Sequence, residues 1–282
     1  MSLHSFHASG TPSLLLVEGD RNGPPLVLLH GVTRAHGDWS PLLDRLAETW
    51  RVIAIDQRGH GESARAGRYL VADYVADAVR IVRDVIGEPV AILGHSLGAM
   101  VAAGVAASLP ELVRGIVLED PPFQTMGERI EGSAWQAQFR GMQEAARRGG
   151  SIDERAAALA AIVLPRPGGG TVRLGELRDQ AALRWSATCL ARLDPDVLTP
   201  VIAGRWLEGY DPLAVARAIR CPVRLLQADP AAGGALADDE SAAFAAAVAE
   251  CTVERFPGVG HAIHWAEPER VCAAAATIMK GL

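Results

Sequence analysis

The sequence is poor in lysine and has no long apolar runs. Its only lysine is Lys280, and 27 basic residues face 33 acidic ones, giving a formal net charge of −6. A nucleic-acid-binding surface is not expected, because it requires clustered positive charge. No apolar stretch reaches the ~18 residues of a membrane-spanning helix. We therefore expect neither nucleic acid nor a membrane as a partner.

Cysteine pairs are also missing. No two of the four cysteines form a C-x-x-C pair, so neither a metal cluster nor a disulfide framework is supported, and ordinary buried thiols are expected. The first ten residues contain no basic segment followed by an apolar one, as a secretory signal would, so we expect a cytoplasmic location. The cysteines are Cys189, Cys221, Cys251 and Cys272.

Apolar residues are abundant enough for a large core. The 282 residues are 49% hydrophobic, which suits one α/β domain with an insertion or two small domains. Short apolar runs alternate with helix-like segments, and this predicts a doubly wound, mostly parallel sheet covered on both faces. Strands are predicted over 13–19, 25–31, 51–56, 89–93, 113–120, 221–229 and 251–258, and helices over 37–50, 70–87, 96–109, 238–250 and a last segment reaching Met279.

The alternation of strands and helices breaks between residues 122 and 211. This stretch has helical patterns and loop clusters but no strong strand, so we predict an α/β core of 1–121 and 212–282 and a helical cap of 122–211. The cap's 11 arginines balance its 11 acidic residues. That balance gives no indication of a strongly charged substrate.

The pentapeptide Gly94-His95-Ser96-Leu97-Gly98 follows a predicted strand and opens a predicted helix. A serine in such a sharp strand-to-helix turn projects its hydroxyl from the top of the sheet. The N-terminus of the helix adds unpaired N–H groups and a positive dipole end. We predict that Ser96 is a nucleophile; the alternative is a tight turn in which Ser96 caps the helix.

Four motifs in order resemble the α/β-hydrolase fold family over nearly the whole chain. They are "LLHGVT" (28–33), "DQRGHGES" (56–63), "GHSLG" (94–98) and "GVGHAIHWAEPE" (258–269). The resemblance implies that His261 is the general base and that the backbone N–H groups of Val32 and Leu97 form the oxyanion hole. His30, His60 and His95 are expected to be structural or to line the pocket.

The acidic partner of His261 is harder to assign. The family commonly carries it three residues past Ala228, where this chain has Ala231, while Asp229 comes too early. Other members carry the acid after the preceding strand. There this chain has Asp120, 24 residues after Ser96, with Glu119 beside it. We predict Asp120, with Asp229 and Glu119 as alternatives.

Serine at position 96 implies an acyl-enzyme and hydrolysis of a hydrophobic carboxylic ester or lactone, with no metal or organic cofactor. A C–C bond (diketone) hydrolase, an amidase and a non-enzymatic small-molecule receptor stay open as alternatives, as does the oligomeric state. Trp135, Phe139 and Met142 recur at helical spacing and are assigned to the core of the cap rather than to the pocket. The predicted substrate pocket comprises Phe123, Trp185, Trp206 and His264.

Overall fold

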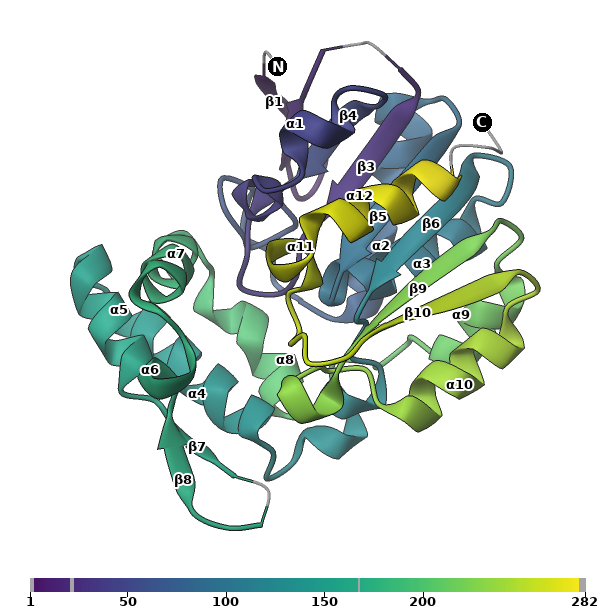
Figure 1. Ribbon diagram of the computed structural model, residues 1–282. Coiled ribbons are helices and arrows are strands. Elements are labelled where there is room, and N and C mark those ends of the chain that lie inside the picture. Colours follow the sequence, from purple (N-terminus) through teal and green to yellow (C-terminus); the bar gives the residue numbers. More distant parts are fainter. Residues whose placement is uncertain (1–2, 21–22, 167, 279–282) are drawn as a thin grey trace.

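The computed structural model describes residues 3–20, 23–166 and 168–278, and its centre is a twisted sheet (Figure 1). The strand order is β1-β2-β4-β3-β5-β6-β9-β10. β2 is antiparallel to both of its neighbours, β1 and β4, and every other neighbouring pair in this sheet is parallel. The predicted doubly wound, mostly parallel sheet is confirmed. The strands are β1 (His4–Ala8), β2 (Leu14–Glu18), β3 (Pro25–Leu29), β4 (Arg51–Ile55), β5 (Val90–His95), β6 (Val113–Glu119), β9 (Val223–Ala228) and β10 (Cys251–Phe256).

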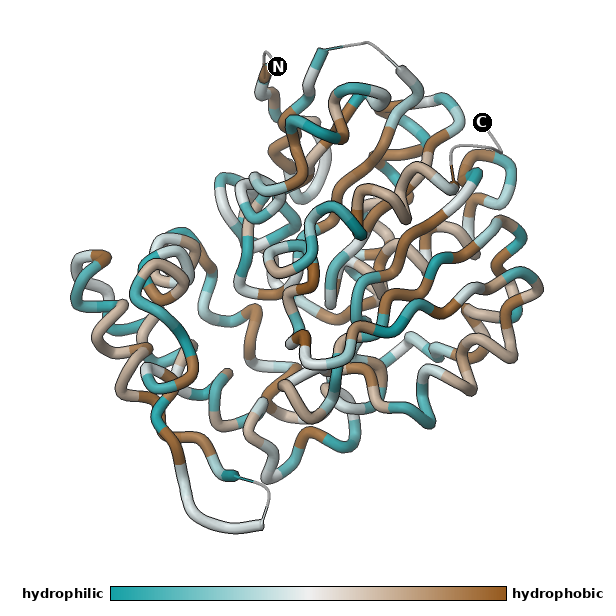
Figure 2. The backbone as a smooth tube through the Cα atoms, viewed as in Figure 1, coloured by the Kyte–Doolittle hydropathy of each residue, from teal (hydrophilic) through white to brown (hydrophobic). Residues whose placement is uncertain are grey.

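Helices cover both faces of this sheet. On one face α3 (Leu97–Ser108) contacts β5 and β6 and is itself covered by α2 (Val71–Arg80) and α9 (Pro212–Ala218), with α10 (Asp238–Ala247) beyond. This double contact explains why α3 is apolar all round. The other face is covered by α1 (Leu43–Leu46) and α12 (Pro268–Thr277), preceded by α11 (Ile263–Ala266). In Figure 2 the central strands are the most continuously hydrophobic part of the backbone.

The insert, residues 122–211, lies to one side of the sheet, beyond the ends of its strands (Figure 1). Its main helices are α4 (Ala134–Arg148), α5 (Ile152–Ala160), α6 (Leu174–Leu177), α7 (Gln180–Leu190) and α8 (Leu198–Ile202). The sequence pattern missed a small hairpin of β7 (Val163–Pro165) and β8 (Thr171–Arg173). Strands this short have too few residues to show a period.

Two further predictions need correction. The segment 37–50 is not one helix: a 3₁₀ turn, η1 (His36–Trp39), precedes α1, and Pro41 between them has no N–H with which to continue a helical hydrogen-bond ladder. The segment 70–87 is helical, but after α2 it continues as a π-helix, η2 (Ile81–Ile86), and ends at left-handed Gly87 as expected. Met279, the expected end of the last helix, lies outside the described residues.

Within the described ranges, no helix combines the length and the apolar character needed to cross a bilayer.

Candidate active site

The predicted site residues come together at the carboxyl ends of the parallel strands. Ser96 follows β5, Asp120 follows β6, Val32 lies just after β3, and His261 lies in the loop after β10. In a parallel sheet these ends share one edge, which is where open α/β sheets bind ligands. The insert covers this edge (Figure 1).

Ser96 occupies a strained turn between β5 and α3. Its backbone has φ 55° and ψ −117°, outside the regions that residues with a side chain ordinarily adopt. A Cβ on Gly94 would lie 2.1 Å from the carbonyl oxygen of Gly98, and a Cβ on Gly98 would lie 1.8 Å from that of Leu29. Both positions therefore require glycine, and together they let strand and helix meet closely enough to hold the strained serine.

Asp120 faces His261. Its Oδ2 lies 2.6 Å from His261 Nδ1, although 141 residues separate the two in sequence. The Asp120 side chain is fully buried and also accepts backbone N–H groups from Ala228 at 3.1 Å, Ala235 at 2.7 Å and Leu236 at 3.2 Å. These donors fix both carboxylate oxygens, so the carboxylate can orient the imidazole.

The two alternative acids have other partners. Asp229 accepts the backbone N–H groups of Ala231 and Gly258, both at 2.8 Å, so its carboxylate stabilises the loops after β9 and β10. Glu119, the last residue of β6, contacts a different histidine, and its Oε1 lies 2.8 Å from His264 Nδ1. The structure thus brings Asp120, and neither alternative, to His261.

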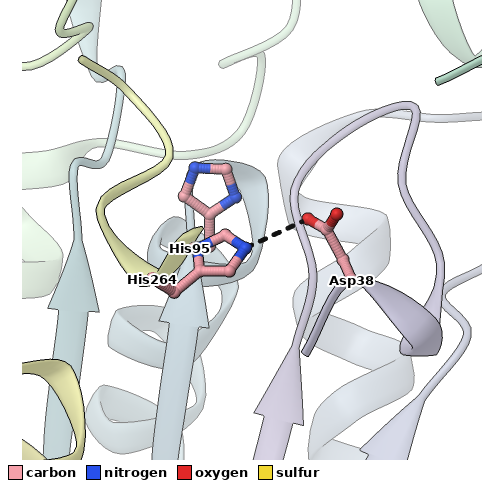
Figure 3. A group of neighbouring side chains, drawn as sticks. All are labelled: Asp38, His95 and His264. Carbon is pink, nitrogen blue, oxygen red and sulfur yellow. Dashed lines mark ion pairs between the residues drawn. The ribbon is translucent and has the colours of Figure 1, made fainter. Parts of the chain in front are cut away.

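Asp38, His95 and His264 form a buried cluster of polar side chains (Figure 3). His264 is wholly buried between two carboxylates: Glu119 contacts Nδ1, and Asp38 Oδ2 lies 3.3 Å from Nε2 in an ion pair. Burial opposes the charge of His264, but the two carboxylates outweigh it and raise the pKa to about 9. Burial alone would raise the pKa of Asp38, yet Arg34 and His264 hold it below its usual range.

The spacing of these three residues would allow a metal ion, but their chemistry does not fit one. A metal-binding histidine must be neutral, whereas His264 carries a proton on each ring nitrogen at neutral pH. The cluster is better described as an imidazolium held by two carboxylates. It fixes the loop that bears His261, because His264 lies three residues further along the same segment.

His95 lies between the two other histidines. Its ring centroid is 4.6 Å from that of His261 and 4.9 Å from that of His264. Burial, followed by the charges of these two histidines, lowers the pKa of His95 well below its ordinary value, so the ring is neutral. Its Nε2 lies 3.1 Å from the carbonyl oxygen of His261 and donates to it, which steadies the loop.

The loop after β3 is held in place by another neutral histidine. The backbone N–H of Thr33, a residue with φ 68°, donates to His60 Nε2 at 3.1 Å. Burial and the neighbouring His30 lower the pKa of His60 to about 3, so its nitrogen can accept this bond across the physiological range. In the described part of the chain, no residue accepts a hydrogen bond from the N–H of Val32 or of Leu97.

Ser96 and His261 line the same narrow cavity, which has a volume of about 40 Å³. That space holds little more than water, whereas pockets for drug-sized ligands measure several hundred Å³. Both core and insert contribute to its wall. The lining residues are Val32, Thr33, Arg34, His95, Ser96, Met126, Trp135, Gln138, Phe139, Met142, Arg178, His261 and Ala262.

The pocket predicted from sequence needs correction, because its four residues lie elsewhere among the described residues. Phe123 stacks on Phe244 at 4.9 Å, and Trp206 is fully buried. Trp185 Nε1 donates to Asp38 at 2.7 Å, and His264 lies in the buried cluster. Residue type and place in the sequence do not separate core positions from pocket positions.

The lining instead includes Trp135, Phe139 and Met142, which the sequence analysis assigned to the core of the insert. Phe139 and Met142 are buried and still border the cavity, because one face of α4 turns towards the site. Arg34 and Arg178 were missed altogether. Arg34 follows the β3 loop motif directly, and that position was its one available signal.

The chain resembles known proteins in sequence. Residues 26–274 match the model of the alpha/beta hydrolase family. A segment of 100 residues is 37% identical to 2-(acetamidomethylene)succinate hydrolase of Mesorhizobium japonicum, and it spans 35% of this chain and 36% of that protein. The sequence match thus covers about a third of that relative's length.

Solved structures resemble the whole chain at lower identity. The crystal structure of E-2-(acetamidomethylene)succinate hydrolase matches with a TM-score of 0.74 and 21% identity, over 99% of this chain and 100% of that one. An enol-lactonase from Burkholderia xenovorans matches with a TM-score of 0.73 and 17% identity, over 97% and 99%. At such identities the likeness establishes the fold alone.

Proposed function

The chain belongs to the alpha/beta hydrolase family, and from that premise we propose that it is a serine hydrolase that cleaves a carboxylic ester or lactone through an acyl-enzyme. The contact between Asp120 and His261 supports this proposal most directly. It supplies an oriented histidine that borders the same cavity as a strained, glycine-flanked serine. We also propose that residues 122–211 act as a cap over this site.

The proposed mechanism uses Ser96 as nucleophile and His261 as general base. Asp120 holds the Nδ1–H tautomer of His261, leaving Nε2 to take the serine proton, and stabilises the imidazolium that forms. The N–H groups of Val32 and Leu97 donate to the developing oxyanion. His261 then protonates the leaving alcohol and activates the water that releases the acid.

An amide is a second candidate substrate. The name of the Mesorhizobium japonicum relative includes an acetamido group, and that of the structural neighbour from Burkholderia xenovorans an enol lactone. The same nucleophile and base serve both bonds, since each reaction passes through a tetrahedral oxyanion. A C–C bond hydrolase and a non-catalytic receptor are the remaining alternatives that the assay below distinguishes.

The test is a substrate panel with wild type, Ser96→Ala and Ser108→Ala. The panel contains p-nitrophenyl esters, lactones, N-acyl amides and vinylogous diketones. We expect ester or lactone turnover by wild type and by Ser108→Ala, a control serine on α3, and none by Ser96→Ala. A fluorophosphonate adduct on Ser96, located by mass spectrometry, gives independent evidence for the nucleophile. Full turnover by Ser96→Ala, or binding of the panel without turnover, would overturn the proposal.

A further inference from the structure

The charge on the cavity wall is entirely positive. Of the lining residues, only Arg34 and Arg178 are permanently charged, and no carboxylate is among them. The remaining side chains are apolar or polar without a permanent charge. A cavity with two cations and no acid on its wall favours an anionic ligand, although the whole chain has a formal net charge of −6.

Arg178 has no anionic partner. It lies between α6 and α7, and among the described residues its side chain makes neither a hydrogen bond nor an ion pair. The residue as a whole is exposed, but the protein surrounding its guanidinium removes solvation and lowers its pKa. The charge of Arg34 lowers the pKa further, and the charge of the adjacent Asp179 only partly opposes this. An arginine stays protonated in proteins nonetheless, so Arg178 is a cation that forms no ion pair among the described residues.

The charge of Arg34 is only partly balanced. Its Nη1 donates to the hydroxyl of Ser186 at 3.1 Å, and its Nε lies 3.9 Å from Asp38 Oδ2. That same carboxylate oxygen already lies 3.3 Å from Nε2 of the cationic His264. Arg34 therefore retains donors and charge for a further anion.

The two arginines reach the cavity wall from different parts of the chain. Arg34 lies on the core, two residues beyond Val32, and Arg178 lies on the cap. An anion held by both would sit near the proposed oxyanion hole and join cap to core. The planar guanidinium binds carboxylates in a two-point geometry that lysine does not reproduce.

We propose that Arg34 and Arg178 bind a free carboxylate of the substrate, so that the substrate class is a short acyl compound carrying an anionic group. This inference rests on the proposed function for the cleaved bond, but it concerns a different part of the substrate. The narrow cavity, with a volume of about 40 Å³, adds a size limit that disfavours a long acyl chain.

Paired esters test this substrate class. We compare kcat/KM for mono-p-nitrophenyl glutarate, which carries a carboxylate, with p-nitrophenyl valerate, its uncharged counterpart. Wild type should prefer the glutarate. Loss of a charged hydrogen bond should lower that preference by about tenfold to a hundredfold in Arg34→Gln and in Arg178→Gln. Arg178→Lys should restore part of it, and Arg148→Gln, an exposed cap control paired with Glu144, should leave it unchanged.

A binding measurement separates the two proposals. Calorimetry on Ser96→Ala, with and without Arg178→Gln, uses monomethyl glutarate and the uncharged dimethyl glutarate as probes. We expect the monomethyl ester to bind more tightly, and only its affinity to fall with Arg178→Gln. Absent turnover with arginine-dependent binding would reject the hydrolase but keep the anion site. Turnover of both esters with no preference and no arginine effect would reject the anion site and keep the hydrolase. Absence of both would reject both.

Discussion

Glu119 and Asp120 are adjacent in the chain, yet their carboxylates bind two different histidines. Asp120 Oδ2 lies 2.6 Å from His261 Nδ1, and Glu119 Oε1 lies 2.8 Å from His264 Nδ1. The end of β6 therefore supports one histidine at the cavity and another behind it. The pair of Asp120 and His261 takes part in the proposed reaction. The pair of Glu119 and His264 holds the loop that carries His261.

Asp120→Asn should lower kcat for p-nitrophenyl butyrate by about 10⁴-fold, the loss known for the equivalent change in a serine protease. The amide cannot hold the productive tautomer. It must also place its NH₂ against a backbone donor of Ala228, Ala235 or Leu236, which should lower the free energy of unfolding by about 1–3 kcal/mol. Asp229→Asn is the control. High activity in Asp120→Asn together with inactivity in Asp229→Asn would reverse the assignment.

Gly98→Ala should destabilise the protein and displace Ser96, because the added Cβ would lie 1.8 Å from the carbonyl oxygen of Leu29. Backbone cannot move aside as a flexible side chain can, so we expect a loss of about 3 kcal/mol, measured by urea unfolding. Gly67→Ala, where a Cβ meets nothing within 4 Å, should stay within about 0.5 kcal/mol of wild type. Equal stability of the two variants would contradict the proposed close approach.

The charged state of His264 should make stability decline between neutral and alkaline pH. Its pKa rises from 6.5 to about 9 on folding. Below pH 6.5 the full contribution is present, and it disappears as the pH rises through 9, a change on the order of 3 kcal/mol. Urea unfolding at pH 6.5 and 9.5 should show this decline in wild type and in His7→Gln, an exposed control. His264→Gln should lack it; an unchanged decline in that variant would count against the buried ion cluster.

Trp185→Phe should loosen the cap. Its indole N–H, on α7, donates to Asp38 Oδ1 at 2.7 Å, and the indole of Trp265, on α11 outside the cap, donates to the same oxygen at 3.3 Å. One hydrogen bond contributes about 1 kcal/mol, so kcat/KM for p-nitrophenyl octanoate relative to the acetate should rise about threefold to tenfold in Trp185→Phe. Trp265→Phe is the matched control. A similar rise in both variants would trace the effect to Asp38 rather than to the cap.

Much of the fold could be predicted from sequence because buried parallel strands are continuous apolar runs. Strands β3, β5 and β6 are such runs; β3 and β5 end within motifs, and β6 ends at Glu119, one of the candidate acids. The edge strand β1 was missed, since four of its five residues are exposed and carry no apolar pattern. The segment 37–50 was overestimated as a helix because its apolar residues recur at helical spacing, and that spacing does not show the interruption of the hydrogen-bond ladder at Pro41.

The site was only partly predictable for a similar reason. Ser96 and the loop of His261 stand in local motifs, whereas the choice among Asp120, Asp229 and Glu119 depends on which side chain reaches a histidine far away in sequence. Arg178 stands in no motif. Its proposed role depends on which groups of the folded chain surround its guanidinium, a property of three-dimensional packing that one sequence cannot express.

The loop after β9 also limits how this protein could be re-engineered. Two of its amides, those of Ala235 and Leu236, point at the Asp120 carboxylate. Moving the acid from position 120 to position 231 would leave those amides without an acceptor. Two substitutions, one at position 120 and one at position 231, are therefore not enough, and the whole turn after β9 must be replaced.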